Sequence, residues 1–271
     1  MAFQFIGSTI AEFRRRNTIL FYAAVAHLLL LVCIIAVLPF DPRTVSGISV
    51  WIKPAKFAST GAIYLLTIGW LLDYLSLPRP RKIRINWVIA ISMVVENVLI
   101  SGQAARGVRS HFNLSSYFNA GVFALMGVMI TLNAIAGAWI TIQFWKTRPV
   151  IAEPYLWGIR FGLLIFLLAS LQGFTMSAHL GHSIGVRDGG PGLPFLNWSV
   201  KGGDLRVAHF IGLHALQVLP LAGYWLSRLN DQARDRRRVY CIWALGIAYG
   251  GFTLLLFVRA LTGHPFIAPS L

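Results

Sequence analysis

Histidine is the residue type in this sequence whose number and placement most clearly suggest chemistry. Seven histidines are present, and imidazole is the commonest metal ligand near neutral pH. His111, His182 and His209 come from three separate segments, each close to the end of a hydrophobic stretch. His214 follows His209 by five residues, which places the two rings about 140° apart around a helix. The spacing predicts a transition-metal centre held by His111, His182 and His209, with His214 deeper, as a neighbouring group or a separate ligand.

A b-type haem is the alternative cofactor, because its two axial ligands come from facing helices at similar depth. His27 and His214 have small neighbours, such as Ala23 and Gly212, that would leave room for a porphyrin. A third interpretation is that the histidines lie separately at the membrane interface and bond to loop carbonyls. The sequence contains no zinc-hydrolase, dithiol, phosphate-loop or nucleophile-elbow motif. The residues leave the cofactor open between a transition metal, a b-type haem and none.

Glu96 is the acidic residue that needs a specific explanation, because it falls inside a hydrophobic segment. Ser92 and Gln103 share its helical face at spacings of four and seven residues. Ionisable groups inside a membrane are costly and usually have a structural or functional partner. Glu96 is therefore expected either to bond a neighbouring helix, with Arg160 as a candidate partner, or to form a proton or ligand site.

Other polar residues are expected to line a cavity near these groups. Gln103 and Arg106 would line the approach, and Arg106 would favour an anionic group. If the protein is a carrier, the path through the membrane would be lined by Glu96, Gln103, Asn119, Asn133 and Gln217.

The elements that position these residues are membrane-spanning helices. Of the 271 residues, 56% are hydrophobic and 12% are charged, whereas soluble domains are about one quarter charged. The charges gather between apolar stretches of about 20 residues, the length that crosses a bilayer. The sequence predicts an all-α, polytopic transmembrane bundle in one domain, 1–271. Its seven spans lie near 18–39, 57–77, 87–105, 118–144, 155–177, 207–227 and 240–261.

The basic residues predict the orientation of this bundle. The net charge is +15, but the basic residues lie in separate short loops, which argues against a nucleic-acid partner. The N-terminal segment and the connections 78–86, 145–154 and 228–239 carry 14 Lys and Arg, and the opposite loops carry 8. Because positively charged loops stay in the cytoplasm, we expect the N-terminus inside and the C-terminus outside. The long connection 178–206 would then form an ordered external loop above the histidines.

Several stretches on the expected outer face resemble those of a known family. They are Trp51–Phe57, Gln103–Gly107 with Ser110–Asn113, Asp188–Leu193, and Gly202–Arg206 running through Gly212–Gln217. Together they resemble an uncharacterised family of bacterial multi-spanning membrane proteins, over most of the chain. The resemblance implies a bacterial inner-membrane location and supplies no mechanism. Its stretches lie around His111, His182, His209 and His214.

Three classes of function follow from these residues. The preferred hypothesis is an outward-facing histidine site that binds a metal or haem, for redox or hydrolytic chemistry on a small or lipidic substrate. The second is a small-molecule carrier or channel, in which the histidines act as pH-sensitive gates. The third is an accessory membrane subunit without chemistry of its own. In each of them the lipid bilayer is the principal partner.

Overall fold

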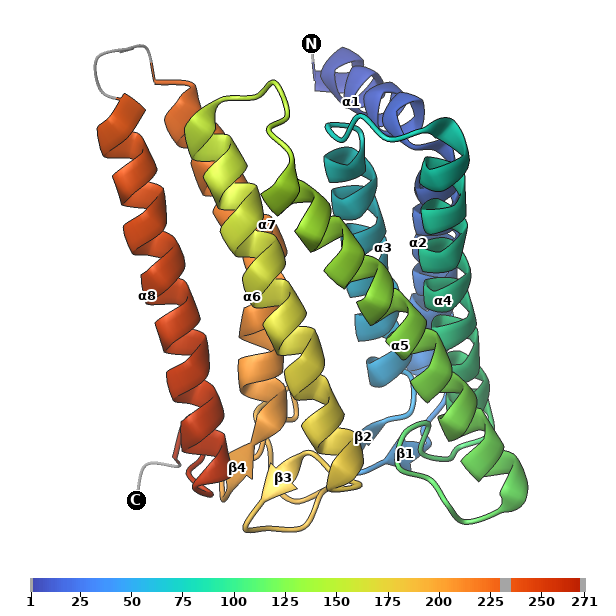
Figure 1. Cartoon of the computed structure of the whole chain (residues 1–271). Helices are drawn as coiled ribbons and strands as arrows, with labels where there is room; N and C mark the ends of the chain where they lie inside the picture. The colour runs from blue at the N-terminus through green and yellow to red at the C-terminus, as the bar shows by residue number, and fades with distance from the viewer. Residues whose placement is uncertain (1, 230–234, 269–271) are drawn as a thin grey trace. The chain divides into compact units, whose positions relative to one another are not determined.

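The structure is a computed structural model that describes residues 2–229 and 235–268 (Figure 1). Seven helices in these ranges are long and apolar enough to cross a membrane, which confirms the predicted all-α class with seven spans. The elements are α1 (Ala2–Arg16), α2 (Thr18–Val37), the 3-10 helix η1 (Leu38–Phe40), β1 (Thr44–Val45), β2 (Ile48–Ser49), α3 (Ile52–Leu72), α4 (Arg79–Ala105), α5 (Tyr117–Lys146), α6 (Glu153–Ala178), β3 (Ser183–Ile184), β4 (Gly203–Asp204), α7 (Leu205–Ser227) and α8 (Asp235–Leu261).

Many large apolar side chains on these helices are exposed rather than packed inside. Leu29 and Val32 on α2, and Leu254 and Leu255 on α8, are each more than 60% exposed. Exposed apolar surface of this kind on long apolar helices is suited to contact with lipid. The chain is therefore an integral membrane protein with several spans.

The chain divides into two compact units, Met1–Ala136 and Gly137–Leu271. In the N-terminal unit α2 packs against α3 and α4. Asn17 caps α2 by accepting from the Leu20 amide, and its side-chain amide donates to Asn86 on α4 (N–O 3.0 Å). Gly61 and Gly69 on α3 face α2 and allow the helices to approach closely. The β1–β2 hairpin lies between α2 and α3, at what we call the hairpin end of this unit.

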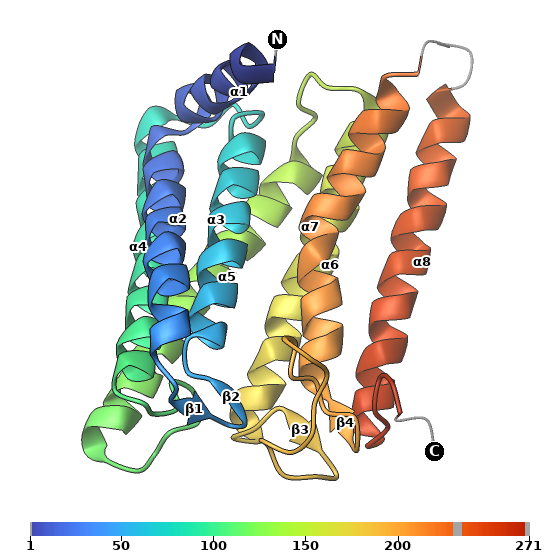
Figure 2. The ribbon, with the colours of Figure 1, turned by 180° about the vertical axis from the view of Figure 1, so that it is seen from behind.

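In the C-terminal unit the helices α6 and α7 pack most tightly, and α8 lies beside them (Figure 2). A Cβ atom added at Gly158 would come within 2.4 Å of the Leu219 carbonyl oxygen, so glycine is required at this crossing. The connection between α6 and α7 carries the β3–β4 pair. Its Trp198 is buried against Val207 and Leu256.

The second span, α3, begins about five residues earlier than the sequence predicts, at Ile52 instead of residue 57. Pro54 explains the difference, because a proline in the first turn of a helix removes only an amide that has no helical partner. The helix therefore includes Lys53 and Lys56.

Candidate functional site

The N-terminal unit brings three titratable side chains together. Lys53 comes from the first turn of α3, Glu96 from the interior of α4, and His111 from the connection between α4 and α5. The Lys53 Nζ lies 3.1 Å from His111 Nδ1, and His111 Nε2 lies 3.4 Å from Glu96 Oε1. The three groups form a continuous chain from the hairpin end into the membrane-spanning part of α4. We call this chain the Lys53–His111–Glu96 site.

The connection folds back over α4 to deliver His111. Gly107 and Phe112 have positive φ angles of 71° and 57°, and the Val108 amide donates to the Gln103 carbonyl. The imidazole is then surrounded by the rings of Phe57, Phe112 and Phe123, with centroids 5.9 to 6.2 Å away. This burial, together with the positive charge of Lys53, holds the pKa of His111 well below its usual 6.5.

The neighbours of His111 define its tautomer. Lysine ammonium groups only donate hydrogen bonds, so Nδ1 accepts from Lys53 and the ring proton lies on Nε2. Glu96 Oε1 lies 3.4 Å from this Nε2, and the Ser110 hydroxyl lies 3.1 Å from Nδ1 beside the ammonium. The neutral imidazole therefore lies between a cation and a carboxyl group.

Glu96 is 4% exposed, and within the described ranges its second oxygen, Oε2, has no hydrogen-bond partner. Arg160, the other partner considered from sequence, bonds instead to the carbonyls of Phe144 and Thr147. Asp204 offers a comparison, because it is 1% exposed and accepts from Ser199 N, Arg206 N and the Arg206 guanidinium. Asp204 is a fully satisfied structural acid, whereas Glu96 is not.

Buried polar atoms without a partner gather in this unit. Among the described residues there are six, and five of them belong to His27, Glu96, Asn97 and Ser101. Each unpaired group costs about 1–3 kcal/mol, so the five together would cost roughly 5–15 kcal/mol, as much as a whole domain's stability. Buried groups of this kind normally bind water or a ligand.

Gln103 and Arg106, expected to line the approach, are bonded to one another and to Asn119. Gln103 donates to Asn119 Oδ1, and Arg106 donates to both Gln103 Oε1 and Asn119 Oδ1. The Arg106 guanidinium also stacks over the Phe118 ring at 4.5 Å. This network fastens the end of α4 to the start of α5.

Two further polar residues from the proposed path also lie on spans. Asn133 Oδ1 accepts from the Tyr64 hydroxyl at 3.0 Å, which joins α5 to α3. Gln217 is half-buried on α7 in the C-terminal unit.

The other histidines selected from sequence lie in the C-terminal unit. His182 Nδ1 is 3.0 Å from Asp188 Oδ1. Burial alone would raise the pKa of Asp188, but the charge of His182 and the bonds to that carboxylate hold it below its usual value. His209 Nδ1 bonds to the Ala169 carbonyl and His214 Nδ1 to the Phe210 carbonyl. Within residues 2–229 and 235–268, no three His, Cys, Asp or Glu side chains group as a metal site.

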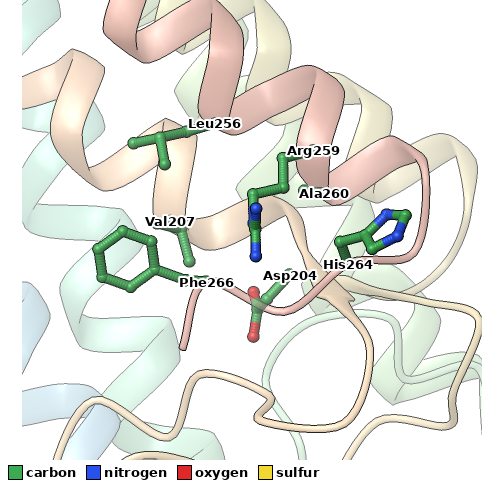
Figure 3. Close-up of a pocket in the computed structure, with 7 residues that line it drawn as sticks. All are labelled: Asp204, Val207, Leu256, Arg259, Ala260, His264 and Phe266. Atoms are coloured by element: carbon green, nitrogen blue, oxygen red, sulfur yellow. The ribbon is translucent and has the colours of Figure 1, made fainter. Parts of the chain in front are cut away.

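A small pocket near β4 and the end of α8 is lined by polar and apolar side chains (Figure 3). Asp204 in this pocket is committed to the bonds described above. Arg259 donates to the Pro265 carbonyl, and His264 contacts the Thr262 hydroxyl. These bonds order the loops at this end of the C-terminal unit.

Sequence reasoning selected Glu96 and His111 separately and missed Lys53 as their partner. The sequence signal was present, since Lys53 lies within the family-like stretch Trp51–Phe57. Comparison with known proteins gives no further identification, because no family model, curated protein or solved structure matches this chain. The functional argument therefore depends on the geometry of the site.

Proposed function

We propose that this protein binds and releases a proton at the Lys53–His111–Glu96 site, as part of a proton-coupled small-molecule carrier. The observation that supports it is the unbroken chain of an ammonium, an imidazole and a buried carboxyl group. Intramembrane carboxyl and imidazole groups are the usual components of proton relays in pumps and transporters.

The chemistry of the relay follows from the two ring nitrogens. A proton arriving at Nδ1 from the Lys53 side is matched by release of the Nε2 proton to the Glu96 carboxylate. An imidazolium beside an ammonium is disfavoured, because like charges repel strongly at this separation. His111 therefore transfers the proton without retaining it, and Glu96 is the group that holds it.

A purely structural role explains the site less well. A buried structural acid is expected to have both oxygens bonded, as Asp204 has. Glu96 Oε1 lies 3.4 Å from His111 Nε2, and Oε2 has no hydrogen-bond partner among the residues that the structure describes. An incompletely bonded carboxyl group is suited to a change of protonation state, because neither state is locked by its neighbours.

The orientation and the membrane are part of the same proposal. The N-terminal segment and the connections 78–86, 145–154 and 228–239 carry the excess of basic residues. Their retention in the cytoplasm would put the hairpin end outside the cell. The resemblance to a bacterial family would place the protein in the inner membrane. The site would then exchange protons with the external medium.

Proton uptake by the purified protein tests the proposal. A pH-sensitive dye in weakly buffered detergent solution reports the protons bound when the solution is acidified. We expect Glu96→Gln to bind fewer protons than the wild type, because the amide does not titrate. Glu153→Gln, at the exposed start of α6, is the control. It removes a carboxyl group elsewhere in the chain and shows how far the loss of any carboxyl group lowers the number of protons bound. Equal uptake by Glu96→Gln and the wild type would contradict the proposal.

Metal or haem binding is the second candidate, supported by the tautomers of His209 and His214. Each donates its Nδ1 proton to a main-chain carbonyl, which leaves Nε2 with a lone pair, the arrangement typical of metal-ligating histidines. His182 lies in the same unit, whereas His111 lies in the N-terminal unit, where its ring nitrogens face Lys53 and Glu96. An absorption spectrum with elemental analysis of the purified protein tests it. Bound metal or haem that is lost in His209→Ala would support this candidate, and metal-free protein would contradict it.

A further inference from the structure

Two helices of the N-terminal unit place His27 at the same depth as Glu96. The Asn17–Asn86 bond joins α2 to α4, and these helices lie side by side and run in the same direction (Figures 1 and 2). His27 and Glu96 each follow this bond by ten residues, which is about 15 Å of rise on either helix. An imidazole and a carboxyl group are therefore level with one another inside this unit.

The His27 ring is a buried base that lies beside the main chain of Met93. It is 2% exposed, and its Nδ1 lies 2.8 Å from the Ala23 carbonyl. A carbonyl oxygen only accepts, so Nδ1 carries the proton and Nε2 is an acceptor. In the described part of the chain Nε2 has no partner. Gly61 makes room for the ring, because a Cβ there would lie 2.6 Å from His27 Cδ2.

Helices α1, α3 and α4 pack against α2. The charged residues of α1 precede Asn17, and His27 lies ten residues beyond it. On α4 the neighbouring groups are Glu96 and Met93, whose side chain lies near Gly61 and whose main chain contacts the His27 ring. On α3 the titratable residue near Gly61 in sequence is Tyr64, whose hydroxyl donates to Asn133. Lys53 lies at the start of α3, at the hairpin end. Glu96 is therefore the acidic group at the level of His27 on these packed helices.

Asn97 and Ser101 extend the polar surface beside Glu96. Asn97 follows Glu96 directly, and Ser101 lies four residues later, one turn along the same face as Asn97. Neither the two Asn97 side-chain amide atoms nor the Ser101 hydroxyl has a partner among the described residues. Polar groups this deeply buried are normally satisfied by internal water, and a row of them along a helix can hold a connected chain of water molecules.

We propose that His27 is a second proton-binding residue, connected to Glu96 by internal water that Asn97 and Ser101 hold. The inference rests on the proton site proposed above and extends it to a second residue, on α2. One proton leaves the Glu96 carboxylic acid and binds Nε2 of His27, which gives a carboxylate and an imidazolium. No electron is transferred, and no bond between heavy atoms forms or breaks.

Nitrogen-15 NMR of ring-labelled histidine, in the full-length protein reconstituted in bilayers, tests this inference. The His27 signal is the one lost in His27→Gln. We expect this signal to change from neutral to protonated as pH falls, and its midpoint to move by about one pH unit or more in Glu96→Gln, because interacting sites titrate as a pair. A His27 midpoint that is unchanged in Glu96→Gln, or a His27 that never protonates, would overturn the inference.

A second pair of variants tests the water connection without altering either titrating group. Asn97→Leu replaces the amide by an apolar group of similar size, and Val98→Leu, on the exposed neighbouring position, is its matched control. Proton transfer between Glu96 and His27 should slow by on the order of 100-fold in Asn97→Leu and stay unchanged in Val98→Leu. Equal rates in the two variants would overturn the water connection.

The two proposals fail in different ways. If Glu96 shows no change of protonation in the wild type, the proton site fails and this inference fails with it. If Glu96 titrates but the midpoint of His27 does not depend on Glu96, only the inference is overturned.

Discussion

Gly61→Ala is the substitution whose effect the structure defines most closely. The new Cβ atom would lie 2.6 Å from His27 Cδ2 and 3.0 Å from Nε2, well inside ordinary contact distance. His27 is fixed by its bond to the Ala23 carbonyl, so the ring moves only by stretching that bond or by pushing α2 away from α3.

The magnitude is the difference between two opposing effects. Overpacking of this kind costs about 1–3 kcal/mol, and replacing glycine by alanine within a helix returns about 0.5–1 kcal/mol. The expected net loss is therefore about 1.25 kcal/mol, which corresponds to a melting temperature lower by roughly 2.5–5 °C in a chain of this size.

Thermal unfolding in detergent measures this loss. Gly102→Ala is the control, because nothing lies within 4 Å of a Cβ added at that exposed position on α4. The double variant Gly61→Ala with His27→Ala should recover part of the lost stability, since the clashing ring is gone and the two changes are coupled. A Gly61→Ala protein as stable as Gly102→Ala would refute the close packing of His27 against α3.

Three further predictions concern the packing and the titrating loops. Gly158→Ala should lower the free energy of unfolding by more than about 2 kcal/mol, because its Cβ meets a rigid carbonyl, whereas Gly251→Ala, which has open space, should not; thermal unfolding compares them. His111 is held neutral in the folded chain, so the unfolded chain takes up a proton that the folded chain does not as pH falls through about 6.5. The free energy of unfolding should therefore fall as pH drops through this range. Thermal melts across pH should show a weaker pH dependence of stability in His111→Gln. The pKa of Asp188 is lowered, so its contribution to stability should be present above about pH 4 and lost below it. Asp188→Asn should cost about 1 kcal/mol at neutral pH, measured in the same melts.

The spans could be predicted from sequence because apolar stretches of bilayer length contain few charges. The predicted start of α3 was five residues too late, because Lys53, Pro54 and Lys56 are residue types typical of a loop. They also fit the beginning of a helix. Hydropathy also identified Glu96, since a carboxyl group inside an apolar segment is conspicuous.

The contacts of the site could not be predicted in the same way. His111 reaches Glu96 because the backbone reverses at Gly107 and Phe112, and no helical or strand period encodes such a reversal. The shared depth of His27 and Glu96 depends on the Asn17–Asn86 bond, which joins positions 69 residues apart. Contacts of this kind are set by tertiary packing and are not visible in local patterns.

Infrared spectroscopy of the Glu96 carboxyl group in liposomes tests the central claim most directly. The pH is stepped on the side of the membrane that carries the β1–β2 hairpin, and the carboxyl C=O band is followed with time. The proton-site proposal predicts a band that responds to this step, is missing in Glu96→Gln and responds on the order of 100-fold more slowly in His111→Gln. A carboxyl band that does not change after the pH step, or that changes as fast in His111→Gln as in the wild type, would contradict the proposal.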